Sequence, residues 1–175
     1  MDLQNASAAL PFLSHGVTQV AWVVEDLDEA VRRHHRLFGT GPWHYYRYDR
    51  SMLSMMRRDG KDVEFVLDTA VANAGPTRLE IVQPLQGDTI YHDFVRSHGY
   101  GGIHHFGLAV DNMREALDLA RHAGFHVTME GSGYGLDGDG HFAYLDTEPA
   151  FGIILELMER PRRRRPPWKV FPPSE

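Results

Sequence analysis

An internal repeat limits the fold of this chain more than any other feature of its sequence. Residues 18–31 align without a gap on residues 104–117, at a constant offset of 86 positions. Val24 matches Val110 identically, and most other aligned pairs are chemically similar. Each copy has an apolar run suited to a buried strand, then an acidic turn and a helical pattern. The chain is therefore expected to consist of two copies of one module.

The ends of the two copies also match. Residues 79–83, Leu-Glu-Ile-Val-Gln, resemble residues 155–159, Leu-Glu-Leu-Met-Glu, at an offset of 76. The second module is therefore ten residues shorter than the first, and the extra length falls around residues 43–73. Further strands are expected at residues 63–69 and 142–146, so each copy has an opening strand, a helix and at least two more strands.

The remaining segments complete the expected organisation. A linking helix is predicted over residues 89–97, with Asp88 as its N-cap. The helix of the second copy is predicted to begin at Asp111 or Asn112, with Glu115 in a capping box, and to end near Gly124. The chain then divides into a loose N-terminal arm, a first module with its linking helix, a second module and a basic tail, over residues 1–14, 15–100, 101–160 and 161–175. The prolines of the tail exclude a regular helix or a central strand there.

Four polar side chains occupy positions where buried strands should be apolar. They are Gln19 and His105, at equivalent positions of the opening strands, and Glu80 and Glu156, at equivalent positions of the closing strands. A carboxylate inside a buried strand costs free energy unless it is paired or bound to metal. A pseudo-twofold axis between the modules would bring all four together. One imidazole with three oxygen donors suits one divalent ion, either Zn, Ni, Co, Mn or Fe.

Each of these residues alone has a simpler interpretation. Gln19 and His105 would each be an ordinary core residue with satisfied hydrogen bonds. Glu80 would form an ion pair with Arg78 or Arg47, and the glutamate of the second module would be an edge-strand charge. The equivalence of all four positions in the repeat favours the metal site.

Other polar and aromatic residues leave alternatives open. His141 and Tyr144 are interpreted as strand packing, with acid, base or substrate-contact roles as the alternative. Residues 43–48 offer aromatic faces either for a ligand or for the core. Strand alternation directs His104 away from His105, which favours a structural role for it.

The charge of the chain is unevenly distributed. Its net charge is −6, of which the segment from Arg160 to Glu175 carries +5 and the rest carries −11. An acidic body disfavours nucleic acid as a partner. The four arginines at residues 162–165 are interpreted as a solvated face. Binding of a phosphorylated substrate such as a coenzyme A ester, or contact with the acidic body, is the alternative.

Composition excludes several other classes. The chain has no cysteine, which excludes disulfides, thiolate metal sites and cysteine nucleophiles. No apolar run approaches the ~18 residues of a membrane span, so no membrane partner is expected. The first residues lack the basic start of a secretory signal, which predicts a cytoplasmic location.

Three short motifs together resemble a known superfamily. They are His-Phe-Gly-Leu-Ala-Val at 105–110, Leu-Glu-Ile-Val-Gln-Pro-Leu at 79–85 and Gly-Ile-His-His at 102–105. Over residues 15–160 the chain is similar to the vicinal oxygen chelate superfamily. The motifs are most similar to its glyoxalase I and methylmalonyl-CoA epimerase branch. The resemblance implies an α+β fold, in which two tandem βαβββ modules form a half-open mixed β-barrel. It also implies metal ligands at Gln19, Glu80, His105 and Glu156.

Two departures from the family pattern refine this expectation. Epimerases usually have histidine where this chain has Gln19, whereas some glyoxalases have glutamine. Extradiol dioxygenases use two histidines and one glutamate on iron, so ring cleavage is disfavoured here.

The expected activity is a divalent-metal-dependent proton transfer next to a carbonyl of a small organic or acyl-thioester substrate. The enzyme would be an isomerase, an epimerase or a glyoxalase-like lyase. Glu156 and Glu80 would combine metal binding with acid–base catalysis, while Gln19 and His105 would be ligands only. Two alternatives are a metal-free ligand-sequestering protein of the bleomycin-resistance type and a non-catalytic metal-bound module. The expected partner is a small-molecule substrate, and a homodimer is left open.

Overall fold

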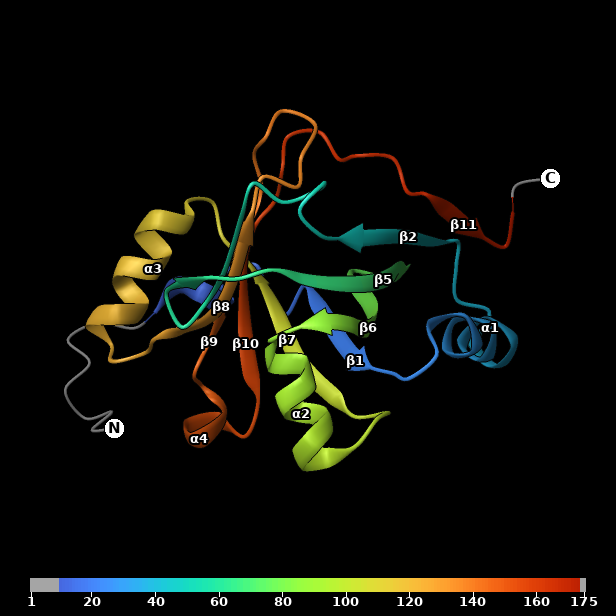
Figure 1. Ribbon diagram of the computed structural model, residues 1–175, viewed down its shortest axis with the longest axis horizontal. Helices are drawn as coiled ribbons and strands as arrows, with labels where there is room; N and C mark the ends of the chain where they lie inside the picture. The colour runs from blue at the N-terminus through green and yellow to red at the C-terminus, as the bar shows by residue number, and fades with distance from the viewer. Residues whose placement is uncertain (1–9, 174–175) are drawn as a thin grey trace.

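The computed structural model describes residues 10–173. Their strands form one sheet of 11 strands that curls into an open half-barrel (Figure 1). The strand order along the sheet is β11-β2-β5-β6-β1-β7-β10-β9-β8-β3-β4. This mixed α+β half-barrel confirms the fold class expected from the sequence.

The elements follow the repeat. The first half contains β1 (Gln19–Val23), α1 (Leu27–Phe38), β2 (Trp43–Tyr48), β3 (Met55–Arg58), β4 (Lys61–Asp62), β5 (Phe65–Ala74) and β6 (Thr77–Gly87). The helix α2 (Ile90–His98) then links the halves. The second half contains β7 (Ile103–Ala109), α3 (Met113–His122), β8 (Val127–Ser132), β9 (His141–Leu145), α4 (Glu148–Phe151) and β10 (Ile154–Glu159). A short helical turn, η2 (Pro11–Leu13), precedes the first half, and β11 (Lys169–Phe171) follows the second.

The two halves meet at the antiparallel pair of β1 and β7. Gln19 pairs with Gly107, and Ala21 pairs with His105. In the repeat, Gly107 is the equivalent of Ala21, and His105 is the equivalent of Gln19. The residue between them on each strand pairs with its own counterpart. A pseudo-twofold axis therefore passes between the two strands at this point.

The closing strands keep the same symmetry. β6 runs parallel to β1 and places Glu80 beside Ala21, while β10 runs parallel to β7 and places Glu156 beside Gly107. Both glutamates thus hold the same register in their own half. The offsets of 86 and 76 read from the sequence are reproduced in the backbone pairing.

The hairpin of β3 and β4 accounts for the extra length of the first module. It lies between β2 and β5 in the sequence, but β3 pairs with β8 of the second half, from Met55 opposite Ser132 to Arg58 opposite Met129. Its turn is formed by Asp59 and Gly60, both with positive φ. This turn geometry matches the twist of a two-residue hairpin.

Of the two helix starts predicted from the sequence, that of α3 is confirmed and that of α2 is wrong by one residue. The Asn112 side chain accepts a hydrogen bond from the backbone N–H of Glu115 and caps α3, as expected. The helix α2 begins at Ile90 rather than at the preceding residue, so its N-cap is Thr89 and not Asp88. The Thr89 hydroxyl accepts a hydrogen bond from the N–H of His92 at 3.2 Å, which fixes this start.

Two helices cover the outer face of the half-barrel at opposite ends of the molecule (Figure 1). The helix α1 packs on the first half with Trp43 and Tyr45, and α3 packs on the second half with Leu108 and Leu145. Phe12 of η2 joins the second of these clusters and is buried. The expected loose arm is therefore anchored in its described part, because burial of this side chain is favourable. Residues 1–9 of that arm lie outside the described residues.

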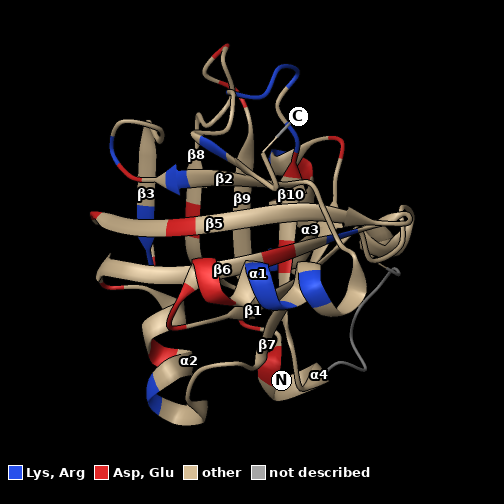
Figure 2. Ribbon diagram, turned by 90° about the vertical axis from the view of Figure 1, so that its right-hand side faces the viewer, with Lys and Arg blue, Asp and Glu red and all other residues tan. Residues whose placement is uncertain are grey.

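The basic tail crosses from one half to the other. Its strand β11 adds to the edge of β2, which agrees with the exclusion of a helix or central strand. Trp168 packs edge-on against Tyr45 at 5.5 Å, and Nζ of Lys169 lies 4.5 Å from the centre of the same ring. Figure 2 shows basic residues of the tail beside an acidic loop at the top of the view. Within residues 10–173, no helix is both long and apolar enough to cross a membrane.

Candidate metal centre and active-site cavity

The structure brings the four polar side chains of the repeat together at the centre of the half-barrel. Gln19 and His105 come from the antiparallel pair of β1 and β7, and Glu80 and Glu156 come from the flanking strands β6 and β10. All four are buried, and His105 is fully inaccessible to solvent. Their convergence follows from the pseudo-twofold register of these four strands.

The atoms of this group lie within hydrogen-bonding range. The Gln19 Nε2 group donates to Oε2 of Glu80 and to Oε2 of Glu156, each at 3.0 Å. The Nε2 atom of His105 lies 3.2 Å from Oε2 of Glu156 and 3.5 Å from Oε2 of Glu80. Glu80 therefore pairs within this group, while Arg47 binds Asp68 instead through two hydrogen bonds of 2.7 Å.

The donors fit a divalent cation. The ligand atoms of Glu80, His105 and Glu156 all lie within 4.8 Å of one another. The amide of Gln19 points into the same centre, and exchanging its two ends would present the oxygen in place of the nitrogen. One imidazole nitrogen with carboxylate and amide oxygens suits a divalent transition ion or zinc. The side chains present can therefore hold a metal ion.

Burial and mutual charge shape the protonation of this group. Burial raises the pKa of Glu80 and the neighbouring charge of Glu156 adds to it, while His105 and Arg78 oppose the rise. Burial alone would lower the pKa of His105, but the two glutamates outweigh it and raise this pKa to about 9. Without a metal ion, the imidazolium thus offsets part of the buried negative charge.

His104 lies behind the metal-binding group. It is buried and stacks on Tyr91 of α2 at 4.4 Å, which agrees with a structural role, but its ring contacts His105 rather than pointing away from it as strand alternation predicted. Its Nδ1 atom lies 3.0 Å from Nδ1 of His105. Burial, with the charge of His105, keeps the pKa of His104 well below its usual range, so the ring is neutral. A neutral His104 accepts the Nδ1–H of His105, which leaves Nε2 of His105 to face the carboxylates.

Gly107 makes space for two of the donors. A Cβ atom at this position would lie 2.5 Å from Cε of Met158, 2.8 Å from Cβ of Gln19 and 3.2 Å from Oε2 of Glu156. Its equivalent in the first half, Ala21, carries that Cβ and is fully buried. The sequence marks Gly107 only as a glycine inside a strand, which is a known sign of close approach.

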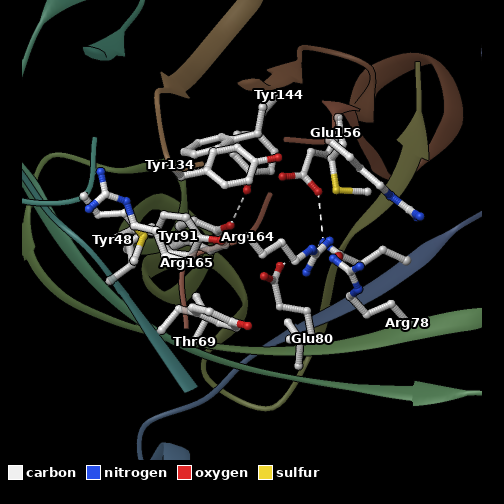
Figure 3. A pocket seen from close by; sticks show the side chains of 18 residues that line it. Tyr48, Thr69, Arg78, Glu80, Tyr91, Tyr134, Tyr144, Glu156, Arg164 and Arg165 are labelled. Atoms are coloured by element: carbon white, nitrogen blue, oxygen red, sulfur yellow. Dashed lines mark hydrogen bonds between the residues drawn. The ribbon is translucent and has the colours of Figure 1, made fainter. Parts of the chain in front are cut away.

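A cavity opens over the metal-binding group (Figure 3). Its tyrosines gather on one side, and the two glutamates with Arg78 lie on the other. The tyrosines are Tyr46, Tyr48, Tyr91, Tyr134 and Tyr144, and the apolar lining residues are Met52, Leu67, Val71, Phe142 and Met158. The cavity is therefore part polar and part apolar, as ligand sites usually are.

Several aromatic residues of uncertain role are now placed. Tyr144 lines the cavity, where its hydroxyl lies 2.6 Å from that of Tyr91. Burial raises the pKa of both groups well above the usual range, which keeps both hydroxyls protonated. His141 instead bonds Glu130 at 2.9 Å and does not line the cavity. In the segment 43–48, Trp43 and Tyr45 lie in the core, and Tyr46 and Tyr48 line the cavity.

Four arginines line the cavity, and the sequence interpretation did not assign them to it. They are Arg78 of β6, Arg160 at the end of the second module, and Arg164 and Arg165 of the tail. The arginine run was expected to form one solvated face, but the structure divides it. Arg162 and Arg163 pair with Asp139 and Asp137, whereas the next two arginines turn to the cavity. The only sequence signal was the density of charge, which does not indicate direction.

Comparisons with known proteins agree on one family. The profile of the glyoxalase/bleomycin resistance protein/dioxygenase superfamily matches residues 18–144. Mitochondrial methylmalonyl-CoA epimerase of Bos taurus is 26% identical over 94 residues, which are 54% of this chain and 53% of that protein. The match thus spans about half the length of this curated relative.

Solved structures show the same fold. Methylmalonyl-CoA epimerase from Mycobacterium tuberculosis superposes with a TM-score of 0.62 at 18% identity, covering 88% of this chain and 93% of that one. A variant of the Streptomyces coelicolor epimerase, in complex with 2-nitronate-propionyl-CoA, gives a TM-score of 0.60 at 16% identity over 86% and 97% of the two chains. At these identities the likeness concerns the fold.

Proposed function

The chain belongs to the glyoxalase/bleomycin resistance protein/dioxygenase superfamily, and on this premise we propose that it is a divalent-metal-dependent enzyme. Its proposed reaction is proton transfer at the carbon next to a carbonyl, of the isomerase or epimerase type. The proposed substrate is a small organic molecule or an acyl thioester. The observation that carries the proposal is the convergence of Gln19, Glu80, His105 and Glu156 at one buried centre, from which Gln19, Glu80 and Glu156 line the cavity.

The two glutamates are the proposed acid–base pair. A bound divalent ion supplies Lewis-acid polarisation of a substrate oxygen, which makes the neighbouring C–H more acidic. Glu80 and Glu156 enter the cavity from opposite halves of the sheet. One can therefore remove a proton from a substrate carbon, and the other can return a proton from the other side.

The tyrosines of the cavity are proposed to bind the substrate oxygen and to exclude water. Tyr48, Tyr91 and Tyr144 stay protonated because burial raises the pKa of each hydroxyl well above its usual range. Protonated hydroxyls fixed in a buried site can donate hydrogen bonds to an oxygen that gains negative charge. Their position opposite the glutamates supports this role (Figure 3).

Solvent isotope exchange tests the proposal. The metal-loaded protein is incubated in D₂O with a panel of 2-substituted acyl-coenzyme A esters and hemithioacetals, and the products are followed by NMR and mass spectrometry. We expect deuterium to enter the carbon next to the carbonyl, and a chelator to stop the exchange. Turnover without exchange of that hydrogen would contradict proton transfer and favour lyase or hydrolase chemistry.

A metal-free ligand-binding protein is the second candidate. The Gln19 amide hydrogen-bonds both glutamates at 3.0 Å, so the group is satisfied in the absence of an ion. Aromatic walls such as Tyr48 and Phe142 would also suit a sequestered ligand. Metal analysis separates the candidates, because the enzyme should retain about one divalent ion per chain after purification without chelators.

A further inference from the structure

We propose that the cavity takes a ligand with a negatively charged group, a carboxylate or a phosphate, and that Arg78, Arg164 and Arg165 hold this group. The three arginines are called the arginine cradle below. This inference rests on the proposed function, since it describes the substrate of the same cavity. It adds a charged anchor that is separate from the metal-binding group.

The cradle has no anionic partner among the described residues. Within residues 10–173, no carboxylate forms an ion pair with Arg78, Arg164 or Arg165, whereas Arg162 and Arg163 beside them in the sequence are both paired. The Nε–H of Arg165 is buried and lacks a hydrogen-bond partner. A buried donor that is left unsatisfied costs free energy, and a ligand oxygen would remove that cost.

The arginines also repel one another. Arg78, Arg160, Arg164 and Arg165 all line the same cavity, so their like charges lie around one space. The lining of the cavity holds four arginines against two glutamates. A divalent ion at the metal centre would balance the charge of both glutamates, and the cations would then lack any counter-charge. An anionic ligand supplies it.

The cradle lies at a junction between two spaces. Its three arginines line the central cavity and also an outer groove, which His44, Asn73 and Pro167 complete. A ligand that reaches the metal-binding group would therefore place its anionic group at this junction and extend outward. Guanidinium groups bind carboxylate and phosphate oxygens in pairs, so the geometry suits either anion.

Backbone contacts hold the cradle in place. Residues 160–171 carry two of its arginines and are attached to the rest of the chain at two places. At one end, the carbonyl of Arg163 accepts a hydrogen bond from the N–H of Leu136 at 2.9 Å, and Arg164 forms a β-bridge with Gly135. At the other end, the N–H of Trp168 donates to the carbonyl of Tyr45 at 3.0 Å. The backbone that carries Arg164 and Arg165 is therefore held in place on both sides by the rest of the fold.

Anion titration of the full-length protein tests this proposal. The probes are propionate, inorganic phosphate and neutral propionamide, measured by calorimetry on metal-loaded and on chelator-treated protein. We expect at least one anion to bind in both states and propionamide to bind in neither. The tighter of the two anions identifies which kind of ligand the cradle accepts.

Arginine variants complete the test. Arg78→Gln and the double variant Arg164→Gln/Arg165→Gln should each weaken anion binding on the order of 10–100-fold. The matched control is Arg162→Gln/Arg163→Gln, which removes the same charge from the same run but faces Asp139 and Asp137, and it should bind normally. Equal binding in the cradle variants and the control would overturn the proposal. Because chelator-treated protein is included, this result is independent of whether the metal-dependent reaction occurs.

Discussion

The centre and the rims of the half-barrel differ in how closely they obey the repeat. At the centre, β1, β7, β6 and β10 keep the pseudo-twofold relation down to single backbone pairs, such as Val20 opposite its own equivalent Phe106. At the rims the symmetry is lost, because one edge is closed by β11 and the other by the hairpin of β3 and β4. All four candidate metal ligands come from the centre, whereas two of the four cavity arginines come from the tail and a third, Arg160, directly precedes it.

This difference separates two tasks. A duplicated centre brings equivalent side chains around one point, which suits an ion and a pair of acid–base groups. An unduplicated rim can carry side chains on one side only, which suits recognition of an asymmetric ligand. Changes at the centre should therefore affect chemistry and metal binding, while changes at the rim should affect ligand binding or local stability.

The largest expected effect is on turnover, from substitutions of the central glutamates. Glu156→Gln and Glu80→Gln keep an oxygen donor but cannot accept a proton, so each should slow turnover by roughly 10²–10⁴-fold. Steady-state kinetics and deuterium exchange with the active substrate measure this loss. If only one variant is inactive, the centre is symmetric in structure but not in function. Full activity of both, with metal bound, would contradict the acid–base assignment.

The next effect concerns the metal itself. His105→Ala removes a nitrogen donor and should weaken metal binding by at least ~10–100-fold. Metal content by mass spectrometry and competition with a chelator measure it. His141→Ala is the matched control, because His141 bonds Glu130 and does not line the cavity. Metal retained at the same affinity in the His105 variant would remove this residue from the site.

A smaller effect tests one place where the two halves of the centre differ. Gly107→Ala would force a Cβ to within 2.8 Å of Cβ of Gln19, and overpacking of this kind lowers the free energy of unfolding by about 1–3 kcal/mol. The reciprocal change in the first half, Ala21→Gly, should cost only about 0.5–1 kcal/mol. Urea unfolding compares the two. Equal losses would mean that the space at Gly107 is not needed.

The smallest effect is expected at the rim. Lys169 contacts Asp28 and the face of Tyr45, and both charged side chains are partly exposed, so Lys169→Met should cost about 0.2–1 kcal/mol. The hydrogen bond from Lys169 lowers the pKa of Asp28 below 3.8. The stabilisation from this ion pair is therefore present above the pKa that Asp28 has in the unfolded chain. It is lost as the pH falls through the lowered pKa of Asp28 in the folded protein. Unfolding curves at neutral and acidic pH should show the variant losing less on acidification, with metal content unchanged at neutral pH.

The sequence predicted the centre well because both copies preserve the pattern there. Gln19 and His105 could be identified because they occupy equivalent positions in the repeat. The two glutamates, at an offset of 76, identified the closing strands. Strand register then brings the four together without further information. The predicted N-cap of α2 was wrong by one residue. Asp88 and Thr89 are both residue types that favour the N-cap position, and only the backbone path decides between them.

The rims could not be predicted in the same way. The pair Asp59-Gly60 was a hairpin signal that the repeat obscured, because the hairpin has no counterpart in the second copy. The directions of Arg162 and Arg164 depend on contacts with residues 135–139, which are far away in the sequence. A run of identical residues contains no information about which members face a cavity.

The hairpin of β3 and β4 has a consequence for folding. It belongs to the first half by sequence but completes the sheet of the second half, with Met55 opposite Ser132. Either half alone would leave strand edges without partners, at β1 or β7 in the centre and at β3 or β8 on the rim, and open edges favour aggregation. Such long-range pairings also form late and slow the folding reaction. Although the chain reads as two copies of a module, the halves should unfold together in one cooperative transition and should not fold when separated.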